Sequence, residues 1–183
     1  MTHPIRIQAG AAAVDITPRA GIALTGYVLR EGPSLGVHDL LYARALVFDD
    51  GHCQAALVVC DLLALDRRFV ASARDAIEAA TNIPGANVMI ACTHTHSGPS
   101  TIFLHNCGEV DETWLPVLRQ HIVCAVQRAS DQRQNAQIGA GASHVYGLAL
   151  NRRDPGGAFD PRLGVVRAAD ARGRTIATIV NYA

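Results

Sequence analysis

The sequence predicts an α/β fold in which mixed β-sheets carry a β-α-β unit and two main helices. Two continuous apolar runs, at residues 54–60 and 87–92, have the length and composition of strands buried on both faces. Between these runs, apolar residues recur at the spacing of one helix face, and a second segment with this spacing begins within residues 111–113. Strand and helix patterns that alternate in this way are typical of an α/β domain.

Two further strands are predicted before the β-α-β unit. Residues 6–16 are small and apolar and stop at Thr17-Pro18, which is a natural end for a strand. The segment 21–36 is rich in glycine and proline and indicates a loop. Residues 41–48 form the second strand, and Asp49-Asp50-Gly51 is the turn that leads into the apolar run after it.

The β-α-β unit spans residues 54–92. Asp66 can cap its helix, and Pro84-Gly85 ends that region. A strand, a crossover helix and a second strand normally give a parallel pair with a right-handed connection, so we expect one here. The expected apolar face of the helix consists of Phe69, Val70, Ala73, Ile77 and Ala80.

The second helix is predicted with Thr113 as its cap, which places Pro116 in the first turn, where a missing N–H costs nothing. A strand at 136–150 and an arginine-bearing loop at 151–161 follow. A final hairpin pairs residues 163–169 with residues 175–182.

The sequence stops on the last strand of that hairpin, without a closing turn or polar tail. Because domains usually end in an exposed segment, we expect residues 1–183 to form one partial domain, truncated at its C-terminus. Uncovered sheet edges and apolar faces would then favour self-association.

The composition excludes several classes of protein. The chain is 49% hydrophobic and 17% charged, too apolar for a disordered chain, and its 16 basic and 16 acidic residues give no reason to expect nucleic acid as a partner. Its five cysteines form no CxxC pair, which argues against a disulfide framework or a cysteine zinc site. No apolar run could span a membrane, and no secretory leader is visible, so we expect a cytoplasmic location.

The strongest chemical signal is the stretch Thr93-His94-Thr95-His96-Ser97-Gly98-Pro99, directly after a buried strand. Side chains two apart on a strand share a face, so His94 and His96 are expected to project together at the carboxyl end of the sheet. Paired imidazoles suit a zinc ion. The alternative is two histidines that merely satisfy their hydrogen bonds near a strand end.

Three other residues are weaker candidates. Asp61 ends the neighbouring strand and could either orient a histidine N–H or cap the following turn. Arg152, in Asn151-Arg152-Arg153-Asp154, could bind an oxyanion or be solvated surface. His38 follows the glycine-rich loop and could line a pocket or be exposed.

In combination, these segments resemble the neutral/alkaline non-lysosomal ceramidase family. The resemblance rests on the opening Val14-Asp15-Ile16-Thr17-Pro18 followed by Gly26-Tyr27, on Gly36-Val37-His38, on the histidine motif at 93–99 and on Asn151-Arg152, all in family order.

The resemblance implies the N-terminal part of a larger catalytic domain with a single Zn²⁺ held by two histidines, a glutamate and a tyrosine. His94 matches a zinc ligand, and His96 and Arg152 match active-site residues that contact the substrate. The other three ligands have no match here, and the second ligand histidine would fall near Asn181-Tyr182-Ala183. The implied activity is hydrolysis of the amide bond of an N-acyl substrate such as ceramide, giving a fatty acid and a sphingoid base. Ser100-Thr101 departs from a Gly-Gly pair in the family, which is expected to stiffen the mouth of the pocket.

Two other interpretations stay open. One is another class of metallohydrolase, such as a barrel amidohydrolase or the metallo-β-lactamase fold. These fit less well, because Ser97-Gly98 stands where the lactamase motif has Asp-His, and at least three strands precede the motif. The other is an inactive fragment that acts at most as an interaction module.

Overall fold

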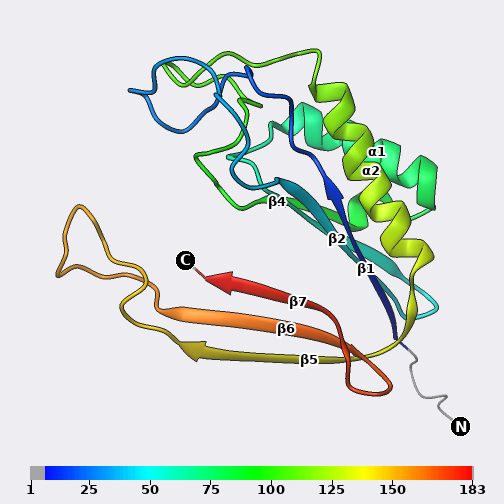
Figure 1. Ribbon diagram of the computed structural model, residues 1–183. Coiled ribbons are helices and arrows are strands. Elements are labelled where there is room, and N and C mark those ends of the chain that lie inside the picture. Colours follow the sequence, from blue (N-terminus) through cyan, green and yellow to red (C-terminus); the bar gives the residue numbers. More distant parts are fainter. Residues whose placement is uncertain (1–6, 183) are drawn as a thin grey trace, which may run out of the picture.

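The computed structural model describes residues 7–182 and confirms an α/β fold (Figure 1). Two helices lie against one face of a strand layer, and a second strand layer lies across its other face. The strands are β1 (Gln8–Asp15), β2 (Tyr42–Asp49), β3 (Gln54–Cys60), β4 (Val88–Cys92), β5 (Gln134–His144), β6 (Arg162–Asp170) and β7 (Thr175–Tyr182), and the helices are α1 (Arg67–Thr81), α2 (Leu115–Asp131) and a short 3-10 turn (Gly85–Asn87).

The strands follow the order β4-β3-β2-β1-β5-β6-β7. The predicted parallel pair of β3 and β4 is confirmed, and the other neighbours are antiparallel. Among the described residues, β1 and β5 pair at Gln8↔Asn135 and Ala9↔Gln134, and the Ala136 N–H donates to the Ile7 carbonyl at 2.9 Å. This narrow connection lets β5, β6 and β7 turn away and cross beneath the first four strands (Figure 1).

The main core lies between the helices and the first strand layer. Fully buried Ile77 from α1 and Ile122 from α2 meet Val58 of β3 there. Helix α2 passes so close to β1 that a methyl group added at Gly10 would lie 2.1 Å from the carbonyl oxygen of Ala129. Glycine is therefore required at this crossing of strand and helix.

A smaller core joins the two strand layers. Ala9, Leu46 and Ala168 are its buried members. Toward the carboxyl end of β7 the layers separate around a groove of about 520 Å³, with Leu57 on one wall and Ile179 on the other. β1 and β2 thus have apolar contacts on both faces, whereas on the groove side of β4 Met89 is exposed.

Helix α1 begins as predicted, with the Asp66 carboxylate accepting from the Phe69 N–H at 2.7 Å. The prediction for α2 was wrong about its cap. Thr113 donates its N–H and hydroxyl to the Asp111 carboxylate, and α2 starts at Leu115 without a side-chain cap. An aspartate two residues upstream competes for the free N–H groups there, forming an Asx-type turn.

The predicted strand at 136–150 was too long. β5 ends at His144, and the chain passes through Gly147, whose φ of +84° is incompatible with a strand. The final hairpin is confirmed, with β6 and β7 joined by a tight turn at Gly173. Arg6, the first residue of the predicted opening strand, lies outside the described residues. Within residues 7–182, no helix is both long and apolar enough to cross a bilayer.

Candidate active site

His94 follows β4 at the carboxyl edge of the sheet. Its N–H donates to the Leu62 carbonyl, and its ring nitrogen Nδ1 lies 3.0 Å from the Leu63 carbonyl oxygen. A carbonyl can only accept, so Nδ1 carries the hydrogen. In a neutral ring this leaves the lone pair on Nε2, which is the form in which histidine binds a metal.

The ring of His96 lies beside that of His94. Their centroids are 5.2 Å apart and their planes are inclined by 68°. His94 is exposed, and His96 is half-buried. The pairing expected from the sequence is therefore present.

The reason given for this pairing was wrong. β4 ends at Cys92, so His94 and His96 are not on a strand, and His94 has a φ of +61°. This left-handed conformation is uncommon for a residue with a side chain and is more frequent for histidine than for most. The bend, not strand alternation, brings the rings together. Such outliers cluster at functional sites, which supports a role for this loop.

Residues 93–99, which we call the histidine loop, are held in place by hydrogen bonds of the two residues that follow them. Thr101 is buried, and its hydroxyl donates to the Ala64 carbonyl at 2.5 Å. Ser100 is also buried, and its hydroxyl lies within 3.3 Å of the carbonyls of Ile102 and Gly108. These bonds tie Ser100 and Thr101 to neighbouring backbone, and the stiffening of the pocket mouth stays a prediction.

A second segment, residues 22–30, runs beside the histidine loop, and we call it the strap. Leu24 forms an isolated antiparallel bridge with Pro99. On either side of it, the N–H of Thr25 donates to the Gly98 carbonyl and the N–H of Ser100 donates to the Ala23 carbonyl, at 3.1 and 3.0 Å. The strap thus reaches His96 from a distant part of the sequence.

The strap makes three contacts with His96. The Tyr27 ring meets the imidazole edge to face, with centroids 5.0 Å apart. Arg30 Nη2 donates to the His96 carbonyl at 2.6 Å, and its guanidinium lies 5.3 Å from the centre of the Tyr27 ring. At Gly26, an added methyl group would lie 2.5 Å from His96 Cγ and 2.9 Å from Nδ1. The Cγ–Nδ1 edge of His96 therefore rests on Gly26.

Sequence reasoning about the site missed Tyr27 and Arg30. Gly26-Tyr27 belongs to the resemblance, but nothing in the local sequence links Tyr27 or Arg30 to His96, which follows Arg30 by 66 residues. The one local signal is an aromatic residue directly after a glycine in a polar loop.

Asp61 does not orient a histidine. It ends β3 at the same sheet edge, but its Oδ2 accepts from the Tyr42 N–H at 3.0 Å and from Arg44 Nη1 at 2.5 Å. The carboxylate thus turns toward β2, away from the histidine loop, and the orienting acceptor is the Leu63 carbonyl. Asp61 therefore links the end of β3 to the neighbouring strand β2.

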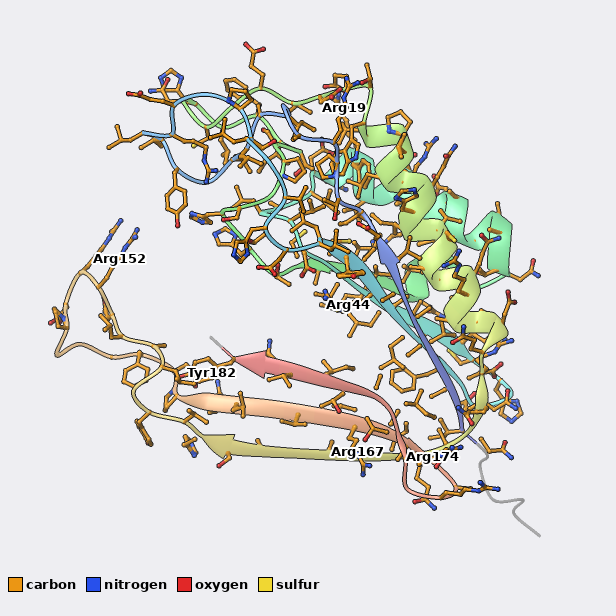
Figure 2. The ribbon with its side chains drawn as sticks, viewed as in Figure 1. Arg19, Arg44, Arg152, Arg167, Arg174 and Tyr182 are labelled. Carbon is orange, nitrogen blue, oxygen red and sulfur yellow. The ribbon has the colours of Figure 1, made fainter. Side chains whose placement is uncertain are left out.

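Arg152 is exposed on the loop between β5 and β6. Figure 2 shows it at the far tip of that loop, and no hydrogen bond joins it to His94 or His96 in the described part of the chain. His38 is also exposed, and its Nδ1 lies 2.7 Å from Asp39 Oδ2. It lines a hollow of about 430 Å³ together with Arg30, Thr95 and Ser97. His38 is therefore exposed at the edge of this hollow, and a part for it in a functional site stays a prediction.

The site fits part of a zinc ligand set. The Nδ1–H of His94 donates to a backbone carbonyl, which leaves Nε2 free to bind a metal. Histidines that bind zinc usually make this hydrogen bond with their other ring nitrogen. Zinc sites take three or four protein ligands. Residues 7–182 contain no cluster of three or more histidine, cysteine or acidic side chains able to hold a metal. His94 is therefore arranged as zinc-binding histidines are, and residues 7–182 do not assemble a complete ligand set around it.

Fold and site together define an α/β protein with a paired-histidine loop at the carboxyl edge of its sheet. Residues 7–160 match the family described as neutral/alkaline non-lysosomal ceramidase, N-terminal. The chain belongs to this family.

Individual relatives agree with this assignment. The chain is 27% identical to the neutral ceramidase of Pseudomonas aeruginosa over an alignment 199 positions long, which covers 96% of the chain and 29% of that relative. The crystal structure of neutral ceramidase from Pseudomonas aeruginosa superposes with a TM-score of 0.83 at 24% identity, covering 97% of this chain and 32% of that one. A ceramidase complexed with C2 gives 0.82, also at 24% identity, with 97% and 31% covered. The chain thus spans about a third of the length of these relatives, and the structural likeness establishes the fold.

Proposed function

We propose that this chain supplies the histidine part of the active site of a zinc-dependent hydrolase that cleaves the amide bond of a ceramide-like N-acyl substrate. The family match and the neutral ceramidase relative support the reaction class. The observation that carries the proposal is the fixed tautomer of His94, whose Nδ1 meets the Leu63 carbonyl beside the ring of His96.

Each residue has a separate part in this proposal. A bound zinc ion supplies Lewis-acid activation of water and of a carbonyl group. His94 would hold the ion through Nε2. His96 would bind the substrate near the scissile amide through its own Nε2, because its Nδ1 edge is packed on Gly26. Arg152 would bind an oxygen of the substrate once its loop approaches the histidines, where a charged donor stabilises developing negative charge.

The proposal is tested in two forms of the protein. In the 183-residue chain, titration with zinc should shift the NMR signal of His94 Nε2, with a dissociation constant weaker than about 1 μM, because fewer than three ligands are present. His94→Ala should abolish this shift. His52→Ala, which removes an exposed histidine on the β2–β3 turn, should leave it unchanged.

In the second form, the chain replaces the matching segment of the Pseudomonas aeruginosa neutral ceramidase. A folded, zinc-loaded chimera should release fatty acid from an N-acyl sphingoid base. His94→Ala should remove both zinc and activity, and Arg152→Ala should lower turnover and leave zinc in place. A folded chimera that binds zinc and hydrolyses no N-acyl substrate would contradict the proposal, as would full activity in His94→Ala.

One observation favours a second candidate, a protein that binds partners and catalyses nothing. It is the lack of a three-ligand metal cluster within residues 7–182. For that function, neither form of the protein should give a zinc-dependent shift at His94.

A further inference from the structure

The geometry points to Tyr27 and Arg30 as positioning residues that fix the backbone and ring of His96, so that its Nε2 faces outward from the strap. This inference rests on the proposed function, since it assigns to His96 a partner on the substrate. Tyr27 and Arg30 act through His96 and are not placed against the substrate.

The first step of the argument concerns the backbone. Arg30 Nη2 donates to the His96 carbonyl at 2.6 Å, and a charged donor makes a stronger bond than a neutral one. The neighbouring peptide groups are held by the Leu24–Pro99 bridge and its flanking hydrogen bonds. Arg30 therefore secures His96, which takes no part in the bridge or its flanking hydrogen bonds.

The second step concerns the ring. An imidazole can rotate about its side-chain bonds, and His96 is only half-buried. Gly26 blocks the Cγ–Nδ1 edge on one side, and the Tyr27 ring meets the imidazole at an interplanar angle of 72°. Edge-to-face aromatic contacts have a preferred geometry, so the pair restricts the rotation of His96.

The third step joins the two contacts. The Arg30 guanidinium lies 5.3 Å from the centre of the Tyr27 ring, within the range of a cation–π interaction. One cation thus holds both the carbonyl of His96 and the aromatic ring that contacts its imidazole. Tyr27 is 57% exposed, so it contributes little to the core, and its packing against His96 and Arg30 is its main interaction.

The test uses the full chain and reads His96 directly. NMR of the histidine side chains should show cross-peaks between the Tyr27 and His96 rings and between the His94 and His96 rings. In Arg30→Gln and in Tyr27→Leu, the His94–His96 cross-peaks should be lost and the His96 ring should become more mobile. The backbone amide signals of β1–β4 should stay unchanged.

Conservative variants separate positioning from a general structural role. Tyr27→Phe keeps the ring and should retain the cross-peaks, and Arg30→Lys keeps a cationic donor and should retain them in part. The matched control is Arg19→Gln, which removes an exposed arginine of the same β1–β2 connection (Figure 2) and should change nothing at His96.

Unchanged His96 mobility and cross-peaks in both Arg30→Gln and Tyr27→Leu would overturn the inference. If Arg30→Gln loses its fold, the exposed Tyr27 decides, because Tyr27→Leu removes no buried group. A separate experiment on the chimera tests the catalytic role of His96 in the proposed function. If His96→Ala leaves hydrolysis by the chimera unchanged, His96 has no catalytic role, while the NMR result still decides whether the strap positions it.

Discussion

At the scale of single residues, one backbone carbonyl determines how His94 can be used. The Leu63 carbonyl fixes the hydrogen on Nδ1 and leaves Nε2 for a ligand. The left-handed residue is His94 itself, which follows the end of β4 at Cys92. Its backbone N–H bond to the Leu62 carbonyl and its Nδ1 bond to the Leu63 carbonyl hold this otherwise unfavourable conformation.

The histidine pair could be predicted from the sequence because its members are two residues apart. The partners of that pair could not. Leu63 acts through its backbone, which leaves no mark in the sequence, and Arg30 meets His96 only because the strap crosses the loop. Asp61 lies at the predicted edge, yet it faces β2, since Arg44 of the neighbouring strand offers it an opposite charge.

Two thiols on neighbouring strands, the buried Cys60 and the half-buried Cys92, give a prediction about pH. Cys60 and Cys92 are partners in the β3–β4 register, and burial raises the pKa of Cys92 from 9.0 to about 11 and that of Cys60 further. Between pH 9 and pH 11 the folded chain therefore holds a proton that the unfolded chain has lost, and the free energy of unfolding falls as pH rises.

Urea unfolding measured below pH 9 and again near pH 11 should show this loss, and Cys92→Ser should reduce it. Iodoacetamide should label the exposed Cys53 well before Cys92 at neutral pH. Equal labelling rates at the two positions would show that Cys92 is not protected by burial.

At the scale of elements, the local sequence was enough to predict the cap of α1 and was not enough to predict the start of α2. Asp66 has no competitor as the cap of α1, whereas Asp111 and Thr113 both stand before α2, and the Asx turn formed by Asp111 prevails. The end of β5 was missed because alternating small residues continue past His144. The positive φ at Gly147 that turns the chain cannot be read from an isolated glycine.

The cap of α1 is open to direct measurement. Asp66→Ala leaves the Phe69 N–H without its acceptor and should lower the free energy of unfolding by about 1 kcal/mol. Asp75→Ala, in the exposed middle of the same helix, should cause no loss, because alanine favours a helix more than aspartate does. Equal losses in both variants, measured by urea unfolding, would rule out the capping explanation.

The crossing of α2 over β1 gives a second element-scale prediction. Gly10→Ala places a methyl group against the Ala129 carbonyl and the Arg133 N–H, which belong to the backbone and cannot rotate away. The expected loss of stability is about 1–3 kcal/mol, as for other overpacked cores. Gly139→Ala in β5 meets nothing within 4 Å and should be tolerated. Thermal unfolding of both variants checks the contrast.

At the scale of the whole molecule, apolar side chains remain exposed on the loop between β5 and β6. Tyr146, Leu148 and Leu150 are 69%, 77% and 68% exposed. Exposed apolar groups of this kind favour association. We therefore expect the sedimentation coefficient of the chain to rise with concentration.

Replacing Leu148 and Leu150 together by serine should weaken this association. Val117→Ser, on the outer side of α2, should have a smaller effect, because Val117 is only 41% exposed and lies apart from that loop. A monomer at all concentrations would show that these side chains do not promote contacts between copies.

The two residue pairs between β1 and β5 also bear on how the chain folds. β5, β6 and β7 follow one another as antiparallel neighbours, and β6 and β7 are joined by a tight turn, so this hairpin can form quickly. β3 and β4 can pair only after the crossover connection through α1 has brought them together, and this pairing is expected to be slower. With so few hydrogen bonds across the junction, amides of β6 should exchange with solvent through a partial opening, at a lower free energy than amides of β2. The strand layer that carries the histidine loop would then keep its structure while the layer that carries Arg152 detaches and re-forms.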